Sequence, residues 1–136
     1  MIRTVPIQTK RQGMLDITAR VQAVVAESGL TEGLCTVFIR HTSASLVIQE
    51  NADPSARLDL EAWMTRLAPE GDPHFTHHDE GPDDMPSHLR AALTSTSLGI
   101  PILDARLMLG RWQGIYLWEH RQQGSTREIV VHVSGG

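Results

Sequence analysis

The sequence predicts a single-domain α+β protein covering residues 1–136. Strand-like segments dominate both ends of the chain and helical patterns lie between them, an order typical of α+β folds rather than of alternating βαβ units. The composition, with 40% hydrophobic and 21% charged residues, is that of an ordinary globular protein. A chain of this length buries roughly 68% of its unfolded surface, which is enough for one core.

Composition also excludes several classes of function. The chain carries 12 basic and 16 acidic residues, a formal charge of −4, and no cluster of lysines or arginines. Because phosphate neutralisation supplies most of the affinity for duplexes, we expect no nucleic-acid partner. No apolar run approaches the ~20 residues that cross a bilayer, so no membrane span is expected. Cys35 is the single cysteine, which fits a reduced, cytoplasmic protein.

The first half of the chain predicts strands around one helix. Loose alternation predicts a strand at residues 4–9, and apolar residues at the spacing i, i+4, i+7, i+8 predict a helix that ends near Ser28 and Gly29. Residues 34–41 and 45–49 have the β-branched pattern of strands. Alternation in the former segment places four residues on one face: Cys35, Val37, Ile39 and His41.

Two helices are expected in the middle of the chain. Asp53 and Pro54 form an N-cap and first-turn pair, and the stripe expected to be buried in this helix is Ala56, Leu60, Trp63 and Leu67. A shorter helix begins near residues 84–86, and its expected buried residues are Met85, Leu89, Ala92 and Leu93. The intervening residues 69–86 are rich in Pro, Gly, Asp and His and predict a long loop, of the kind that is often functional.

Three further strands are predicted near the C-terminus, at residues 100–103, 114–121 and 127–133, with a hairpin-like connection at 122–125. Alternation places Glu119 on the face of Ile115 and Leu117, and His120 on the opposite face. A glutamate on an apolar face is costly to bury without a partner, so either this face opens at the strand end or Glu119 is paired. For Arg127 an exposed ion pair is favoured over a role in phosphate binding.

Two segments carry candidate chemistry. Residues 41–45 offer the imidazole of His41 and three hydroxyls at a strand end, where turn N–H groups and hydroxyls can hold a phosphate and a histidine can transfer a proton. The alternative is a turn with a hydrogen-bonded histidine. Asn51 and Asp53 precede the second helix, and for these residues turn and capping roles are favoured.

The second segment is the densest group of potential metal ligands in the chain: His74, His77, His78, Asp79, Glu80, Asp83, Asp84 and His88. Imidazole and carboxylate ligands suit zinc or a harder divalent ion. The alternative is a solvated acidic loop with incidental histidines. Asp84 and His88 lie four residues apart at the start of a predicted helix, so their side chains can face each other.

Three of these segments resemble one known family. HTSASLVIQENADPSARLDLE (41–61), EGPDDMPSHLRAAL (80–93) and LGRWQGIYLWEHR (109–121) are similar to motifs of the YjbQ family, which is linked to secondary thiamine-phosphate synthase activity. The resemblance covers nearly the whole chain. His74 and His78 do not match it, and Trp118 and Arg111 stand where relatives have cysteine and threonine.

The resemblance implies an antiparallel β-sandwich core with two or three inserted helices, a homotrimer, and one site built from all three motifs. The implied reaction couples a pyrimidine-methyl diphosphate to a thiazole phosphate and releases diphosphate, with a divalent metal, zinc or magnesium. The expected catalytic residues are His41, Asp84 and Glu119; those expected to bind the phosphorylated metabolite are Thr42, Ser43, Asn51 and Arg121; the expected metal ligands are His77, His88 and His120. The alternatives are a metal-dependent hydrolase of a phosphorylated metabolite and a non-catalytic metabolite-binding trimer.

Overall fold

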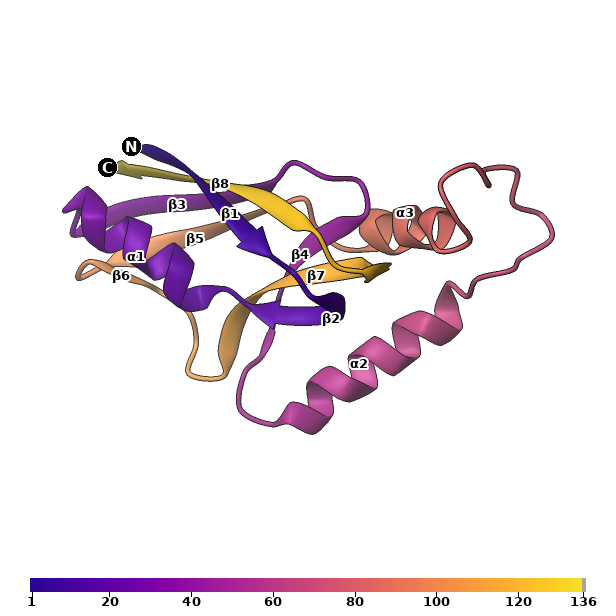
Figure 1. The fold of residues 1–136 in the computed structure, drawn as a ribbon. Helices are drawn as coiled ribbons and strands as arrows, with labels where there is room; N and C mark the ends of the chain where they lie inside the picture. Colours follow the sequence, from indigo (N-terminus) through magenta and orange to yellow (C-terminus); the bar gives the residue numbers. More distant parts are fainter. Residues whose placement is uncertain (136) are drawn as a thin grey trace.

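The computed structural model describes residues 1–135 and contains eight strands and three helices (Figure 1). In chain order these are β1 (Ile2–Gln8), β2 (Arg11–Asp16), α1 (Thr18–Ser28), β3 (Glu32–Ile39), β4 (Ala44–Glu50), α2 (Pro54–Leu67), α3 (Asp84–Leu93), β5 (Ser97–Leu103), β6 (Arg106–Leu107), β7 (Gln113–Gln123) and β8 (Thr126–Gly135). None of these helices is long and apolar enough to cross a membrane.

The strands form two antiparallel sheets. One sheet has the order β1-β8-β3-β5-β6, and the other has the order β2-β7-β4. Their inner faces share one hydrophobic cluster, which contains Val37 and Val131 from the larger sheet and Leu46 and Leu117 from the smaller one. This core also includes Val21 and other residues of α1. The architecture is therefore the α+β class that the element order predicted, with the β-sandwich core that the family resemblance implied.

Helices α2 and α3 lie beside the smaller sheet. Met64 of α2 is buried in a second cluster with Met14, Tyr116 and Trp118, on the face of the sheet that points away from the main core. The predicted N-cap is confirmed, because the Asp53 side chain accepts hydrogen bonds from the Ser55 amide at 2.9 Å and hydroxyl at 2.8 Å. This face is therefore covered by helices, and His120 lies beneath them.

The buried stripes predicted for the two helices were wrong. In α2, Trp63 and Leu67 are each 50% exposed, and Met64 is buried instead. In α3 the expected apolar residues are half-buried or exposed, and the buried ones are Asp84, Pro86, Ser87, Arg90 and Ala91. The reason is that α3 turns its polar side towards partners on β7, such as the His120 carbonyl that accepts from Ser87 Oγ at 2.9 Å.

The predicted hairpin between the last two strands was also wrong. β7 pairs with β2 and β4, whereas β8 pairs with β1 and β3. The chain therefore crosses from one sheet to the other at residues 124–125. A Cβ atom at Gly124 would lie 2.1 Å from the Thr9 carbonyl oxygen, so the tight crossing requires glycine at this position.

Candidate functional site

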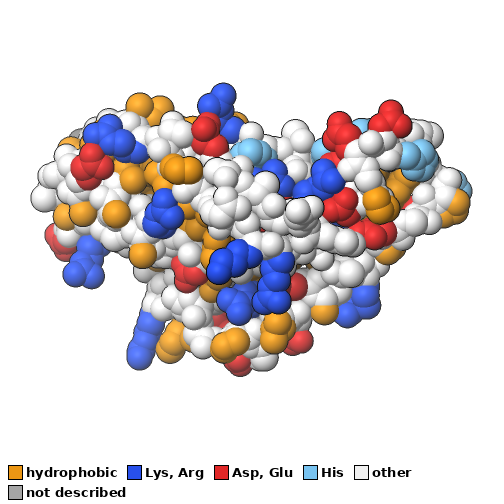
Figure 2. All heavy atoms as spheres, viewed as in Figure 1, with side chains coloured by type: hydrophobic (Ala, Val, Ile, Leu, Met, Phe, Trp, Pro, Cys, Tyr) orange, Lys and Arg blue, Asp and Glu red, His pale blue; other side chains and the backbone are white. Residues whose placement is uncertain are grey.

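Acidic and histidine side chains gather at one end of the molecule, over α3 and the loop before it (Figure 2). Asp84 is the centre of this group and is 1% exposed. Its Oδ2 lies 2.7 Å from His77 Nε2 and 2.8 Å from His88 Nε2. Its Oδ1 accepts a hydrogen bond from Arg121 Nη1 at 2.7 Å. One buried carboxylate thus joins a loop, a helix and the end of β7.

Arg121 holds the N-terminus of α3 against β7. Its Nε donates to Asp83 Oδ2 at 3.1 Å, and its Nη2 donates to the Glu80 carbonyl at 2.8 Å. The loop reaches this position through Gly81, whose φ of 103° favours glycine, and a Cβ atom there would lie 3.2 Å from Asp83 Oδ1. All three nitrogens of the guanidinium are therefore engaged by the protein.

The charges around Asp84 set its protonation state. Burial alone raises the pKa of this carboxyl, but the hydrogen bond from His77 and the charges of His88 and Arg121 hold the pKa below its ordinary value. The pKa of Asp83 is likewise lowered: burial opposes the shift, and the Gln122 amide and Arg121 produce it. Both aspartates are carboxylates at neutral pH.

The orientation of the His88 ring indicates that a proton or a metal ion lies between His88 Nε2 and Asp84. The ring Nδ1 donates to the Thr42 carbonyl at 2.9 Å, so the neutral ring presents a lone pair at Nε2, facing Asp84 Oδ2. Two such lone pairs repel unless a proton or a metal ion lies between them. Ligand atoms of His77, Glu80, Asp84 and His88 all lie within 4.8 Å of one another. This donor set can bind a divalent metal ion.

A second network surrounds Glu119, which is 1% exposed. Arg127 Nε donates to Glu119 Oε1 at 2.8 Å, and Arg127 Nη2 donates to Oε2. Thr9 Oγ1 donates to Oε1 at 2.7 Å. Glu119 therefore faces the core, as alternation predicted, and it is paired. The expectation of an exposed ion pair for Arg127 was wrong, because this side chain is 7% exposed.

His41 lies next to this ion pair. Its Nε2 accepts a hydrogen bond from the Glu128 amide at 2.8 Å, so the neutral ring carries its proton on Nδ1. That nitrogen lies 3.3 Å from Arg127 Nη1, which cannot accept. Burial, followed by the Arg127 charge, lowers the pKa of His41. Two N–H donors thus lie side by side, an arrangement that suits an anionic oxygen.

Residues 41–43 connect the two networks. Thr42 supplies the carbonyl that orients His88, and Ser43 Oγ accepts from Arg127 Nη2 at 3.0 Å. A hollow of about 400 Å³ is lined by Ser43, Asp83, Arg121 and Arg127, together with residues 122–125. Two predicted site residues, Ser43 and Arg121, therefore line one hollow, and Arg121 links it to Asp84 of α3.

Two predicted site residues do not join this group. The His120 ring lies on the other face of β7, fully buried, with Nε2 2.8 Å from Ser45 Oγ. Asn51 lies at the opposite end of β4, where its Nδ2 donates to the Gln113 carbonyl at 3.2 Å. The potential metal ligands that the chain brings together are thus His77, Glu80, Asp84 and His88, and not His120.

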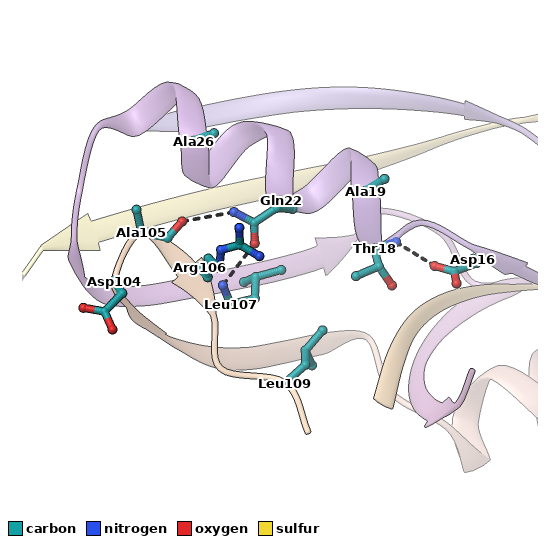
Figure 3. A pocket seen from close by; sticks show the side chains of 10 residues that line it. All are labelled: Asp16, Thr18, Ala19, Gln22, Ala26, Asp104, Ala105, Arg106, Leu107 and Leu109. Carbon is teal, nitrogen blue, oxygen red and sulfur yellow. Dashed lines mark hydrogen bonds between the residues drawn. The ribbon is translucent and has the colours of Figure 1, made fainter. Parts of the chain in front are cut away.

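A hollow of about 770 Å³ lies elsewhere, between α1 and β6 (Figure 3). In it the side chain of Gln22 donates to the Ala105 carbonyl at 3.1 Å and accepts from the Leu107 amide at 3.1 Å. None of the predicted catalytic, phosphate-binding or metal-binding residues lines it. The two hydrogen bonds of Gln22 fasten α1 to the edge of the larger sheet.

Sequence reasoning missed Arg127 and Thr9 as site residues. A usable signal for Arg127 was present, since strand alternation places it on the same face as Ile129 and Val131. An arginine and a glutamate that both point into one core are expected to pair. Thr9 gave no such signal, because its contact with Glu119 joins residues 110 positions apart.

The fold and the site define a class: a small α+β sandwich with a histidine–carboxylate cluster at one end. The model of the UPF0047 protein YjbQ-like family matches residues 3–136, and the chain belongs to this family. It is 54% identical over 129 residues to a UPF0047 protein of Synechocystis sp., covering 95% of this chain and 88% of the relative. It is 37% identical over 134 residues to YjbQ of Escherichia coli O157:H7, covering 98% and 96%.

Solved structures share the fold. A YjbQ/UPF0047 family protein from Clostridium acetobutylicum is 34% identical, with a TM-score of 0.88 over 97% of this chain and 99% of that one. A hypothetical protein from Aeropyrum pernix K1 is 26% identical, with a TM-score of 0.90 over 100% and 99%.

We predict that the Glu119–Arg127 pair is strongly coupled. Glu119→Leu and Arg127→Met should each lower the free energy of unfolding by about 3–5 kcal/mol, since each leaves a buried charge unpaired. The double variant should lose at least about 1 kcal/mol less than the two single losses combined. Denaturant titration measures these values.

The exposed pair Arg40–Glu128 is the control, and its removal should cost less than about 1 kcal/mol. Additive losses at Glu119 and Arg127 would contradict the coupling.

We also predict acid destabilisation through His120. Burial, together with the charges of Arg90 and Arg127, lowers the pKa of His120 from 6.5 to about 3. As the pH falls below 6.5 the unfolded chain binds a proton that the folded chain excludes, so stability decreases. One such proton gives a slope of roughly 1.4 kcal/mol per pH unit.

His120→Asn should remove this slope between about pH 6 and pH 5. His74→Asn, at a 93% exposed side chain, should retain it. An unchanged slope in His120→Asn disproves the assignment.

Proposed function

We propose that the chain is a metal-dependent enzyme acting on small phosphorylated metabolites in the cytoplasm. The proposed reaction couples a pyrimidine-methyl diphosphate to a thiazole phosphate, with release of diphosphate. The observation that carries the proposal is the convergence of His77 Nε2 and His88 Nε2 on one buried carboxylate oxygen of Asp84.

The residues present fit a divalent metal ion. His77, Asp84 and His88 would hold it, with Glu80 within reach, and the Thr42 carbonyl fixes the His88 ring as carbonyls do in metal sites. Two imidazoles and carboxylates favour zinc over magnesium. A metal ion at this site supplies positive charge that stabilises a departing diphosphate.

The protein's own donors suit the phosphate groups of the substrates. His41 Nδ1–H lies 3.3 Å from Arg127 Nη1, and Ser43 Oγ accepts from Arg127, so its hydroxyl hydrogen is free to be donated. In water-poor surroundings such fixed donors stabilise a negative oxygen without reorganisation. Because its pKa is lowered, His41 acts at neutral pH as a hydrogen-bond donor through Nδ1.

Two other residues, Glu119 and Arg121, hold residues of this site in position. Glu119 keeps the Arg127 guanidinium in place, and Arg121 keeps Asp83 and Asp84 in place. Arg121 uses three of its five N–H groups to hold Asp83, Asp84 and the Glu80 carbonyl, and it lines the hollow beside Ser43, so in this proposal it positions Asp84 and can also donate to phosphate.

The proposal includes self-association as a trimer. The outer face of the larger sheet carries Leu34 and Phe38, each 45% exposed, and Leu103, 40% exposed. Within residues 1–135 no helix packs on this face, since α1 belongs to the core on the inner side. An uncovered, partly apolar sheet face is a suitable surface for a second copy.

Metal binding is tested by titrating zinc into chelator-treated protein in a calorimeter. We expect one ion per chain in the wild type and at least about a tenfold loss of affinity in His88→Ala. The matched control is His78→Ala, because His78 is exposed and lies outside the ligand group. Equal zinc affinity in wild type and His88→Ala would refute the site.

The reaction is tested by product analysis with both substrates and zinc. Thiamine phosphate and diphosphate should form together, and no product should form when the thiazole phosphate is omitted. Ser43→Ala should raise KM by about tenfold, the cost of one hydrogen bond to a charged group, whereas the exposed Ser134→Ala should not. Phosphate release without the thiazole phosphate would instead indicate a hydrolase. Tight ligand binding with no product under any metal would indicate a binding protein.

Self-association is tested by light scattering during gel filtration. We expect a mass three times that of the 15.0 kDa chain, and a smaller assembly for Phe38→Asp. Leu58→Asp is the control, because Leu58 is an exposed leucine on α2, away from the sheet face. A monomeric wild type rules the trimer out.

A further inference from the structure

A small cavity of about 40 Å³ lies beneath α2, on the face of the smaller sheet that carries His120. Its lining includes Glu61 and Thr65 of α2, Arg90 of α3, His120 of β7 and Gln12 of β2. The cavity is separate from the metal-ligand group and the hollow at Arg121 and Arg127. One internal water needs ~10–15 Å³ of such space, so the cavity can hold at least one.

Two buried side chains present unpartnered nitrogens here. Among residues 1–135, Arg90 Nε and His120 Nδ1 are the buried side-chain polar atoms that lack a hydrogen-bond partner. Arg90 is 3% exposed and His120 is fully buried. The opposite end of each side chain is fixed: Arg90 Nη2 donates to the Ala68 carbonyl at 2.6 Å, and His120 Nε2 lies 2.8 Å from Ser45 Oγ. A buried polar atom without a partner costs free energy, so these nitrogens call for a hydrogen-bond partner that the protein's own groups do not supply.

The charges around the cavity decide what kind of ligand it takes. Arg90 forms no ion pair among the described residues, and neither does the half-buried carboxylate of Glu61 that lines the same cavity. One positive and one negative group thus flank the space, and the buried His120 ring is neutral. The site is already balanced in charge, which favours a neutral ligand over an anion.

We propose that this cavity is a binding site for ordered internal water that bridges Glu61, Arg90 and His120. Water accepts from Arg90 Nε–H and donates to the Glu61 carboxylate, and it pairs with His120 Nδ1 in either tautomer of the ring. It also completes the ion pair that Glu61 and Arg90 do not form directly.

The water bridge would connect α2 to α3 through a series of hydrogen bonds. From His120 the hydrogen bonds continue to Ser45 Oγ and then to Thr94 Oγ1, which lies 2.5 Å from Ser45 Oγ. With the water in place, an unbroken line joins Glu61 on α2, through β7 and β4, to the C-terminal end of α3. The line thus ties α2 to α3, the helix that carries Asp84 and His88.

The water is tested by a crystal structure at high resolution. We expect ordered density within hydrogen-bond distance, about 2.7–3.2 Å, of both Arg90 Nε and His120 Nδ1. An empty cavity overturns the proposal. Crystals soaked in bromide separate water from an anion, because an anomalous peak in the cavity would show that the occupant is an anion and would also overturn it.

Variants of Glu61 test the bridge in solution, independently of metal binding or turnover. Glu61→Leu should lower Tm by about 3–6 °C, since it removes the water's acceptor, and Glu61→Gln, which can still accept a hydrogen bond, should lower it by less than half as much. Asp59→Leu, on the exposed side of α2, is the matched control and should change Tm little. A Tm for Glu61→Leu equal to or above that of the wild type rejects the bridge.

Discussion

The buried ion pair between Glu119 and Arg127 is the interaction on which the rest of the site depends. Glu119 belongs to the smaller sheet and Arg127 to the larger one, so the pair ties the two halves of the sandwich together where the core ends. Either charge, buried there without its partner, would strongly destabilise the fold. Arg127 also holds the carbonyl and hydroxyl of Ser43, and the adjacent Thr42 carbonyl orients His88. A contact made to satisfy buried charge therefore determines where an imidazole of the proposed metal site points.

The orientation of helix α3 is also determined by buried polar and charged groups. An amphipathic helix ordinarily buries its apolar side, but this one faces the protein with Asp84, Ser87 and Arg90, because its neighbours on β7 are the Arg121 guanidinium and the His120 carbonyl. Of the apolar residues expected to be buried, Leu93 is 61% exposed, Ala92 is exposed, and Met85 and Leu89 are half-buried. Part of the apolar surface of α3 is therefore exposed to solvent or to a second copy of the chain. The polar side of the helix faces β7 and contributes to the site.

Several features could be predicted from neighbouring residues alone. Asp53 caps α2 because the capping bond reaches only two residues along the chain. Asp84 and His88 meet because helical geometry brings residues four apart together. The opposite orientations of Glu119 and His120 follow from the two-residue period of a strand. The crossing at Gly124 could not be predicted in this way, since it depends on which sheet β8 joins.

By itself, the sequence determined the α+β class, most of the elements, the family resemblance and the residues available for chemistry. Each of these depends on local spacing or on direct comparison of residue order. The tertiary structure decided which of those residues share a site. It joined His77, Asp84 and His88, placed Arg127 beside His41, and separated His120 and Asn51 from them. The physical reason is that sheet partners and helix faces are selected by burial and charge pairing between distant segments, and local periodicity carries no information about those distances.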